Sequence, residues 1–494
     1  MPFPSDLEIA QAAHIAPLSE IATQLGLGDD VLEPYGRTVA KIDLTALQQV
    51  QNRPRGKYVV VTAITPTPLG EGKTTTSVGL AQAMKHIGKV GLLALRQPSM
   101  GPTFGIKGGA AGGGYSQVIP MEILNLHLTG DFHAVTAAHN LLAAMVDNHL
   151  HHGNALGLSV KNITWKRVLD VNDRSLRNVI IGLGPKEDGV ERESGFDITA
   201  ASEVMALLAL ATSMEDLRAR LGRIVVGYTE NKVAVTAEQI GCAGAMAVIL
   251  RDAIKPNLMQ TLENTPALIH TGPFGNIATG NSSVIADKLG IHMCDYLITE
   301  AGFGADMGAE RFFNIKCRVS GMVPDAAVLV ATVRALKAHS GQYKVVAGKP
   351  LPPEMLQESP DDVRAGATNL AKQIENVKAH GVSPVVAINA FPTDHPSEHA
   401  AIKEIAEALG ARVAICTHFA DGGAGAVELA QAVVAACDEE SHFEFLYPDD
   451  ASLKEKIYAV ASRIYGAATV EYSEIAEEQL AMFDANGFSH LPVC

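Results

Sequence analysis

The sequence predicts an α/β fold built on a mostly parallel sheet, and three observations support this prediction. Short apolar runs alternate with helix-like segments through residues 163–346 and again beyond residue 361. The runs are apolar at nearly every position, as expected of strands that are buried on both faces. One run, residues 58–64, leads directly into a glycine-containing turn and a helical segment. Such alternation is typical of a parallel sheet covered by helices on both faces.

The individual elements follow from local patterns. Ser5 and Glu8 have the spacing of a capping box, which opens a first helix. Gly26 ends a second helix near residues 17–25, because glycine favours helix termini. Apolar spacing predicts further helices at residues 44–50, 77–88, 132–150, 199–211, 237–253, 330–338, 361–380, 452–465 and 473–484, and from Pro396 onward. Continuous apolar runs predict strands at residues 58–64, 90–95, 179–183, 224–227, 267–270, 296–299, 327–330, 385–389 and 413–417.

Composition excludes several classes of protein. The chain has 494 residues, 47% of them hydrophobic and 19% charged, as in a globular protein of roughly two to four domains. The net charge of -15 provides no general attraction for nucleic acid. An anionic substrate therefore needs a locally built site of arginine, lysine and backbone amides.

Targeting signals and cysteines point to a cytoplasmic enzyme. The segment MPFPSDLEIAQAA has acidic residues where a signal peptide would be basic and then apolar. No apolar run approaches about twenty residues, so we expect no membrane span and no membrane partner. The six cysteines are far apart and form no CxxC pair, which favours reduced thiols in a cytoplasmic compartment.

Residues 65–76, TPTPLGEGKTTT, predict a nucleotide site. A strand, a glycine-containing loop and Lys-Thr at a helix start bind phosphates through loop amides and the helix N-terminus. The general pattern GxxxxGK[ST] requires glycine where this chain has Thr67, while its other defined positions match. The residues predicted to bind ATP or GTP are Thr67, Pro68, Leu69, Gly70, Glu71, Gly72, Lys73 and Thr74. Lys73 would reach the β- and γ-phosphates, and the Thr74 hydroxyl would hold Mg²⁺. The alternative is an ordinary tight turn with a surface lysine.

Two features after the loop are candidates for binding an anion. Arg96 follows the strand predicted at residues 90–95, and ligands of open α/β sheets bind at the carboxyl ends of strands. Its position alone fits an anion contact and a solvent-facing side chain equally well. Residues 101–120 are rich in glycine, which permits close approach of the backbone to a ligand. Interspersed apolar residues favour an ordered binding loop over a flexible linker.

Histidines and aromatic rings supply the remaining site candidates. His127 and Asp131 lie next to the glycine-rich stretch and are predicted to make polar, catalytic contacts with substrate. The histidines in and after the helix at residues 132–150 do not place three ligands on one face, so exposed or capping roles are favoured over a metal. Phe303 lies between glycines after a strand and is a candidate ligand-facing ring. Phe391 and Phe419 each follow a strand and could enclose a flat heteroaromatic ligand, although core packing of both rings is the favoured alternative.

Composition also predicts the domain organisation. Residues 349–353, KPLPP, mark the best boundary because proline interrupts helices and strands. We expect a P-loop-type α/β domain over residues 1–348, with a glycine-rich insertion at about 101–120. A second, smaller α/β domain is expected over residues 361–444, and the start of an incomplete third domain over residues 445–494.

The chain resembles formate–tetrahydrofolate ligases over essentially its whole length. The segments that carry this resemblance occur in the family's order, at residues 65–84, 95–121, 125–149, 191–199, 261–280, 299–310 and 385–394. The resemblance implies ATP-dependent joining of formate to tetrahydrofolate, which gives 10-formyltetrahydrofolate, ADP and phosphate through formyl phosphate. Arg96 matches the family arginine thought to hold formyl phosphate. The resemblance also implies a pterin between Phe391 and Phe419, with Pro392 and Phe303 nearby, and a homotetramer.

Three departures from the family pattern bear on activity. Phe419 replaces a common tryptophan, so folate binding is expected to be weaker. Gln97 replaces a glutamate common in bacterial relatives, which affects a predicted monovalent-cation site. Relatives continue several tens of residues past the position of Cys494, so a C-terminal segment is expected to be missing. The alternative function is a nucleotide-binding protein with weak or no ligase activity; a switch ATPase fits the loop but not the folate-type segments.

Overall fold

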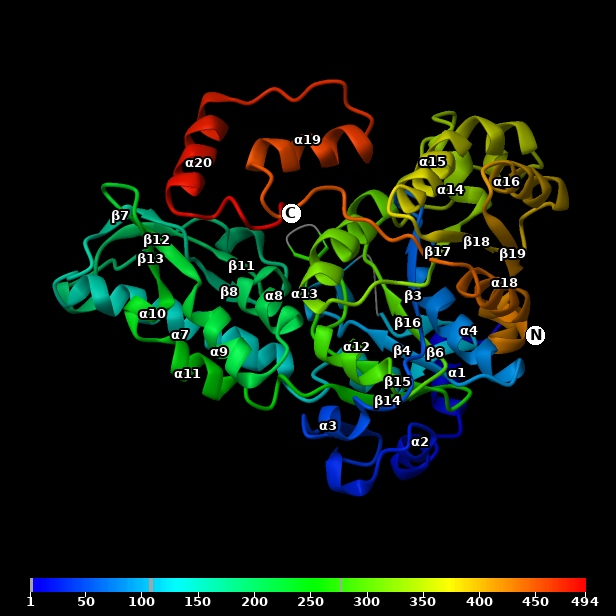
Figure 1. Cartoon of the computed structure of the whole chain (residues 1–494), viewed down its shortest axis with the longest axis horizontal. Coiled ribbons are helices and arrows are strands. Elements are labelled where there is room, and N and C mark those ends of the chain that lie inside the picture. The colour runs from blue at the N-terminus through cyan, green and yellow to red at the C-terminus, as the bar shows by residue number, and fades with distance from the viewer. Residues whose placement is uncertain (1–2, 106–109, 276–277) are drawn as a thin grey trace.

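The computed structural model describes residues 3–105, 110–275 and 278–494. A twelve-stranded sheet organises the fold, in the order β1-β2-β14-β15-β4-β16-β3-β17-β18-β19, with β6 attached to β14 and β5 attached to β6 (Figure 1). The strands are β1 (Leu32–Tyr35), β2 (Val39–Ile42), β3 (Lys57–Ala63), β4 (Gly91–Leu95), β5 (Gly112–Gly113), β6 (Ser116–Ile119), β14 (Asn257–Thr261), β15 (Pro266–Ile269), β16 (Tyr296–Glu300), β17 (Ala326–Ala331), β18 (Ser383–Asn389) and β19 (Arg412–Cys416).

The strands from β15 to β19 along this path are parallel, whereas β1, β2 and β14 pair antiparallel. The predicted α/β class with a mostly parallel sheet is therefore confirmed. Because β4, β16, β3 and β17 run in the same direction, their carboxyl ends meet at one edge of the sheet. This edge is where ligands bind in open α/β sheets.

Helices cover both faces of the sheet, because each central strand buries alternate side chains in different cores. In β3, Tyr58 and Val60 pack into one core, while Val59 and Val61 pack into the other. The helices that flank the sheet or precede it are α1 (Asp6–Ala12), α2 (Leu18–Gln24), α3 (Ala46–Val50), α4 (Lys73–His86), α6 (Met121–Asn125), α12 (Val284–Gly290), α14 (Val333–His339), α15 (Pro360–Lys378), α16 (Pro396–Ala408), α17 (His418–Asp421) and α18 (Val427–Cys437).

A separate lobe lies to the left in Figure 1 and corrects the expectation that one alternating sheet extends through residues 163–346. Its elements are α7 (Asp131–His151), β7 (Leu158–Ile163), β8 (Arg167–Leu169), β9 (Val179–Ile181), β10 (Arg192–Ser194), β11 (Phe196–Ile198), α8 (Glu203–Leu210), α9 (Met214–Gly222), β12 (Val225–Thr229), β13 (Ala234–Thr236), α10 (Ala237–Ile240) and α11 (Ala243–Ile249). The strands predicted near β9 and β12 belong to small sheets of this lobe rather than to the main sheet. Apolar periodicity identifies a strand but does not specify its partners.

The structure adds detail to the glycine-rich stretch at residues 101–120 and to the predicted domain boundary at residues 349–353. The glycine-rich stretch contains α5 (Met100–Thr103) and the β5–β6 hairpin, which joins the sheet at β14, so part of it is strand rather than loop. Residues 106–109 of that stretch lie outside the described residues. Strands β18 and β19 continue the main sheet beyond β17, so the sheet crosses the predicted boundary at residues 349–353. The division into three domains stays a prediction.

The last helices, α19 (Leu453–Arg463) and α20 (Glu474–Ala485), lie between the lobe and the sheet at the top of Figure 1. The Asn486 side chain donates to the carbonyl oxygen of Lys232 in the lobe at 3.0 Å. The Tyr465 hydroxyl donates to the carbonyl oxygen of Asp306 beside the sheet at 3.0 Å. Within the described residues, none of the helices combines the length and apolar character needed to cross a membrane.

Candidate active site

The predicted nucleotide loop lies between the end of β3 and the start of α4. Thr67, at the position where the general pattern has glycine, is held by Glu71: the Thr67 amide and hydroxyl donate to Glu71 Oε1 at 2.8 and 3.0 Å. Glu71 is buried, and the carbonyl oxygen of Glu71 accepts a hydrogen bond from Asn389 Nδ2 at 3.0 Å. Threonine therefore fits the glycine position because the loop itself supplies an acceptor for both of its donors.

Glycine is required at the end of this loop for two reasons. Gly72 has φ +78°, a conformation that other residues adopt only with strain. A Cβ atom at Gly72 would also lie 2.4 Å from Asn389 Nδ2. Gly72 is the N-cap of α4, and no side chain caps that helix. The first amides of this 14-residue helix are thus free to bind an anion.

Lys73 and Thr74 open α4 and face different partners. The Lys73 ammonium makes no hydrogen bond or ion pair within the part of the chain that the structure describes. Burial lowers the pKa of Lys73, and the nearby carboxylates of Glu300 and Glu71 act in the opposite direction. The Thr74 hydroxyl donates to Glu300 Oε2 at 2.6 Å. The lysine is therefore available for a ligand, whereas the threonine is already tied to a carboxylate.

Glu300 joins the loop to Arg96. It ends β16, which lies between β3 and β4, so its side chain stands at the same sheet edge as both. Glu300 is buried, and Glu300 Oε1 lies 3.5 Å from Arg96 Nη2. Arg96 Nη1 also donates to the carbonyl oxygen of Pro273 at 3.1 Å. The structure thus brings together Lys73, Thr74 and Arg96 around one carboxylate.

The sequence predicted Phe303, just after β16, as a site residue, and Glu300 was not among the predicted residues. Glu300 has a feature that favours a functional role: it is an acidic residue at the carboxyl end of a buried strand, and that strand pairs with β3, which precedes the nucleotide loop. Recognising it required the strand order, because β16 follows β4 and β3 by about two hundred residues in the chain.

Buried polar atoms without partners lie next to Arg96. Both amide atoms of Gln97 and the Thr271 hydroxyl have no hydrogen-bond partner within the described residues, although both side chains are buried. The two residues are joined by the backbone, where the Gln97 amide donates to the Thr271 carbonyl oxygen at 2.6 Å. Most buried polar side-chain atoms in proteins have a partner. These atoms therefore fit a small polar ligand or ion beside Arg96.

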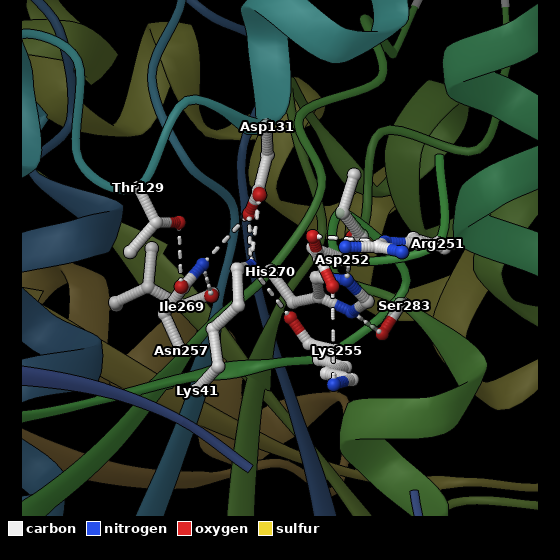
Figure 2. A network of polar contacts seen from close by, with 11 residues as sticks. Lys41, Thr129, Asp131, Arg251, Asp252, Lys255, Asn257, Ile269, His270 and Ser283 are labelled. Carbon is white, nitrogen blue, oxygen red and sulfur yellow. Dashed lines mark hydrogen bonds and ion pairs between the residues drawn. The ribbon is translucent and has the colours of Figure 1, made fainter. Parts of the chain in front are cut away.

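Asp131 is placed in a closed network instead, shown in Figure 2. Its carboxylate is 3% exposed and accepts hydrogen bonds from Lys41 Nζ at 2.8 and 3.1 Å and from Asn257 Nδ2 at 2.9 Å. Lys41 also donates to the carbonyl oxygen of Lys255 at 3.1 Å. Burial raises the pKa of Asp131 and lowers that of Lys41, while their mutual attraction opposes both shifts.

The predicted histidine contacts are also remote from the loop. His127 is exposed, and His127 Nδ1 lies 2.9 Å from His133 Nε2. Within the described ranges, neither His127 nor Asp131 contacts the loop, Arg96 or Glu300. His139 is stacked on Trp165 and hydrogen-bonded to Ser202, and burial lowers its pKa to about 4. Residues 3–105, 110–275 and 278–494 contain no cluster of three side chains that could hold a metal ion.

The three predicted aromatic contacts have different surroundings. Phe391 has its ring 3.7 Å below the guanidinium of Arg334, and its amide donates to Asp394 Oδ2 at 2.9 Å. Phe419 is 42% exposed and stacks on Phe3, with ring centres 5.4 Å apart. Phe391 and Phe419 follow the neighbouring strands β18 and β19, but the two rings do not touch each other.

Phe303 and Pro392 complete the predicted set. Phe303 has φ +60° and is 41% exposed, so its backbone is strained while its ring faces outward. A Cβ atom at Gly275 would lie 2.9 Å from Phe303 Cδ2, so the loop opposite must be glycine for the ring to sit there. Pro392 is exposed next to Phe391.

A cavity of 810 Å³ adjoins the N-terminal segment on the Phe3 side of Phe419. Its lining is Phe3, Pro4, Glu8, Ile9, Ala12, Ala13, Tyr115, Leu262, Glu263, Ala420, Asp421 and Gly422. Phe3 also makes an edge contact with Tyr115, with ring centres 6.0 Å apart. The N-terminal segment thus covers an aromatic face that the sequence predicts for a pterin.

Comparison with known proteins gives a consistent result along the chain. The sequence model of the family "Formate--tetrahydrofolate ligase" matches residues 4–494. The chain is similar to a formate–tetrahydrofolate ligase of Saccharopolyspora erythraea, with 68% identity over 494 residues, which is 100% of this chain and 87% of that protein. It is also similar to formate–tetrahydrofolate ligase 1 of Rubrobacter xylanophilus and to the ligase of Cutibacterium acnes. Each of these is 65% identical over 99% of this chain and 87% of its own length.

The expectation that a C-terminal segment is missing after Cys494 stays a prediction. The identity is high, and the match extends over nearly the whole chain. The chain belongs to the formate–tetrahydrofolate ligase family.

Proposed function

We propose that this protein joins formate to tetrahydrofolate with ATP, giving 10-formyltetrahydrofolate, ADP and phosphate. Family membership supports the reaction. The observation that carries the proposal is the meeting of Thr74 and Arg96 on the two oxygens of Glu300, at 2.6 and 3.5 Å. One edge of the sheet thereby combines a loop suited to binding phosphates with the Arg96 guanidinium, which is suited to binding an acyl phosphate.

ATP binds with its phosphates over the first turn of α4. The loop amides and the free helix N-terminus are donors for the phosphate oxygens, and Lys73 binds the β- and γ-phosphates. Lys73 suits this role because its ammonium has no partner in the described parts of the chain. Glu71 shapes the loop by holding Thr67, and Gly72 ends the turn.

The Thr74 hydroxyl and the Glu300 carboxylate fit Mg²⁺, which prefers oxygen ligands. The two side chains already lie within hydrogen-bond distance, so both could contact one ion or its bound water. Thr74 and Glu300 would hold the Mg²⁺, which when bound would neutralise negative charge on the phosphates. Glu300 is thus a metal ligand that we add to the predicted Thr74.

Arg96 positions formate and then formyl phosphate. A formate oxygen attacks the γ-phosphorus, a new P–O bond forms, and the bond to the ADP oxygen breaks. Phosphorylation is needed because formate itself would have to expel oxide, which is a very poor leaving group. The planar guanidinium of Arg96 matches the carboxylate first and the phosphate afterwards. The monovalent-cation site, which the replacement of glutamate by Gln97 affects, stays a prediction.

Tetrahydrofolate then attacks formyl phosphate. The N10 lone pair forms a bond to the formyl carbon, phosphate leaves with the electron pair of the broken C–O bond, and N10 loses its proton. We assign Phe391, Pro392, Phe419 and Phe303 to the pterin site. Phe391 can offer only the ring face opposite Arg334.

Two predicted catalytic residues receive other roles in this proposal. Asp131 is a structural ion-pair partner of Lys41, because its carboxylate is buried and fully engaged. His127 pairs with His133 at the surface and takes no step in the scheme above. A homotetramer and a cytoplasmic location stay predictions.

An assay for 10-formyltetrahydrofolate tests the proposal directly. Product should form only with ATP, Mg²⁺, formate and tetrahydrofolate together. ATP binding without product would overturn the ligase and favour a nucleotide-binding protein. In the Arg96→Ala variant, formyl transfer should fall much more than nucleotide affinity; equal losses would contradict the role of Arg96.

The role of Glu300 has a readout that does not depend on turnover. The Glu300→Gln variant should bind Mn²⁺ with ADP about tenfold or more weakly, measured by electron paramagnetic resonance. Loss of even an outer-shell partner of a metal ligand costs roughly 10–100-fold in metal affinity, and loss of a ligand should cost at least as much. Metal-free ADP should bind as in the wild type. The control is Glu238→Gln, which alters an exposed pair with Arg218 in the lobe. Unchanged Mn²⁺ affinity in Glu300→Gln would remove Glu300 from the metal site.

A further inference from the structure

Arg334 is a side chain that contacts both halves of the proposed active site. It lies at the start of α14, just after β17. Its guanidinium carbon is 3.7 Å from the centre of the Phe391 ring. Arg334 Nη2 donates to the carbonyl oxygens of Leu69 and Gly70 in the nucleotide loop, at 3.4 and 3.3 Å. The stack and the hydrogen bonds come from one planar group, so neither can move without the other.

The surroundings of Arg334 hold this plane in place. The side chain is half-buried, and its Nε is a buried donor without a partner in the described residues. Burial lowers the pKa of Arg334, whereas the carboxylates of Asp394 and Glu71 raise it. Glu71 shapes the loop through Thr67, and Asp394 fixes the Phe391 backbone. The two carboxylates near Arg334 therefore belong to the same two parts that its guanidinium joins.

The contacts to the loop are long for hydrogen bonds, at 3.3 and 3.4 Å, compared with a typical 2.9–3.0 Å. They can shorten if the loop closes around phosphates or if a second ring presses on Phe391. The two loop contacts of Arg334 are thus longer than ordinary hydrogen bonds when neither ligand is bound, and each ligand would improve the fit for the other.

The chemistry gives such coupling a purpose. Formyl phosphate is an acyl phosphate, and water can attack its carbonyl carbon just as an amine can. ATP is wasted whenever the intermediate forms before the accepting amine is in place. A link that makes the loop bind ATP best when a pterin occupies Phe391 would limit this loss.

We propose that Arg334 is a positioning residue that couples nucleotide binding at the loop to folate stacking on Phe391. This inference rests on the proposed function, since it takes Phe391 as part of the pterin site. Linkage requires the effect to be reciprocal: tetrahydrofolate tightens ATP binding by the same factor as ATP tightens tetrahydrofolate binding.

The test is the affinity for ATP with and without saturating tetrahydrofolate, measured by calorimetry without formate so that no reaction occurs. Coupling between sites typically changes affinity by about 5–150-fold. We expect a wild-type ratio in this range and a ratio near one in Arg334→Met, which keeps the bulk but removes the charge and the donors. Arg334→Lys keeps the charge but not the planar group, so its ratio should also fall to near one.

Arg318→Met is the matched control. The Arg318 guanidinium stacks on Phe445 at 4.0 Å and donates to the Tyr447 carbonyl oxygen, far along the chain from the loop. Its loss should leave the affinity ratio unchanged. Thermal unfolding of all variants shows which are folded, and Arg334→Lys, as the smaller change, serves if Arg334→Met does not fold.

A second readout separates coupling from simple loss of binding. With formate present, the Arg334 variants should hydrolyse more ATP per 10-formyltetrahydrofolate formed than the wild type or Arg318→Met. An unchanged affinity ratio in folded Arg334 variants would overturn the inference, as would a wild-type ratio of one in a protein that makes product. Failure of the wild type to make product would instead overturn the proposed function.

Discussion

Two lysine–carboxylate groups in this protein have opposite surroundings. Lys41 and Asp131 are 0% and 3% exposed, lie 2.8 Å apart and satisfy each other together with Asn257 (Figure 2). Lys73 lies near Glu300 and Glu71, yet its ammonium makes no hydrogen bond or ion pair with the described residues. The difference teaches that a buried charge with all its partners is costly to unpair, whereas a partly buried charge without them is available for chemistry.

Breaking the ion pair between Lys41 and Asp131 should have the largest effect, and that effect should be on the free energy of unfolding. Asp131→Asn or Lys41→Met leaves one buried charge without its partner, which destabilises by about 3–5 kcal/mol. Urea unfolding measures the loss. Activity per folded molecule should change little, because Asp131 contacts neither the loop nor Arg96 among the described residues. A large fall in kcat with unchanged stability would return Asp131 to the catalytic residues.

Replacing Lys73 should have the opposite effect, a loss of activity without a loss of stability. Lys73→Met should lower kcat by about 10²–10³-fold, the usual result of losing one donor to developing charge. The free energy of unfolding should stay the same or rise slightly. Lys85→Met is the control on the same helix, because Lys85 is exposed and donates only to the Glu263 carbonyl oxygen at 3.4 Å. Near-normal turnover in Lys73→Met would refute the assignment of the loop.

Lowering the pH should reduce the stability of the folded protein, because four buried histidines stay neutral in it. Burial lowers the pKa of His270, next to the Lys41 pair, to about 3, and those of His139, His380 and His418 to about 4. The unfolded chain therefore takes up protons below about pH 6.5 while these folded side chains stay neutral. Their stabilisation is complete above that pH and is lost as the pH falls.

Each buried histidine contributes a slope of about 1.4 kcal/mol per pH unit, or about 2 kcal/mol between pH 6.5 and 5. Urea unfolding at several pH values measures the slope. His270→Gln should reduce it by one histidine's share. A stability that does not fall between pH 6.5 and 5 would mean that these histidines are protonated in the folded protein.

The smallest expected effect concerns Phe419, whose ring face is already occupied by Phe3. Phe3→Ala should tighten tetrahydrofolate binding by up to about tenfold, because an aromatic pair is worth about 0.5–1.5 kcal/mol. Phe419→Trp should tighten it further by offering a larger face. Phe483→Ala removes a ring from another pair, with Phe488, and serves as the control. Unchanged folate affinity in both variants would argue against stacking at Phe419.

Local patterns predicted much of the fold. The capping box at Ser5 and Glu8 is present, and the helices α4, α7 and α15 lie close to their expected ranges. These features depend on neighbours within a few residues, so the sequence displays them directly. The partners of β9 and β12 could not be predicted, because strand pairing joins residues that are distant in the chain.

The sequence by itself determined the class of fold and the family and predicted the nucleotide loop, because these depend on short motifs and their order. Only the tertiary structure decided which charged residues face the site. Asp131 was predicted to make catalytic contacts with substrate, but its carboxylate pairs with Lys41, while Glu300 and Arg334 contact the loop from distant parts of the chain. The physical reason is that a side chain's chemistry depends on its burial and partners, and these are set by contacts across the sheet rather than along the chain.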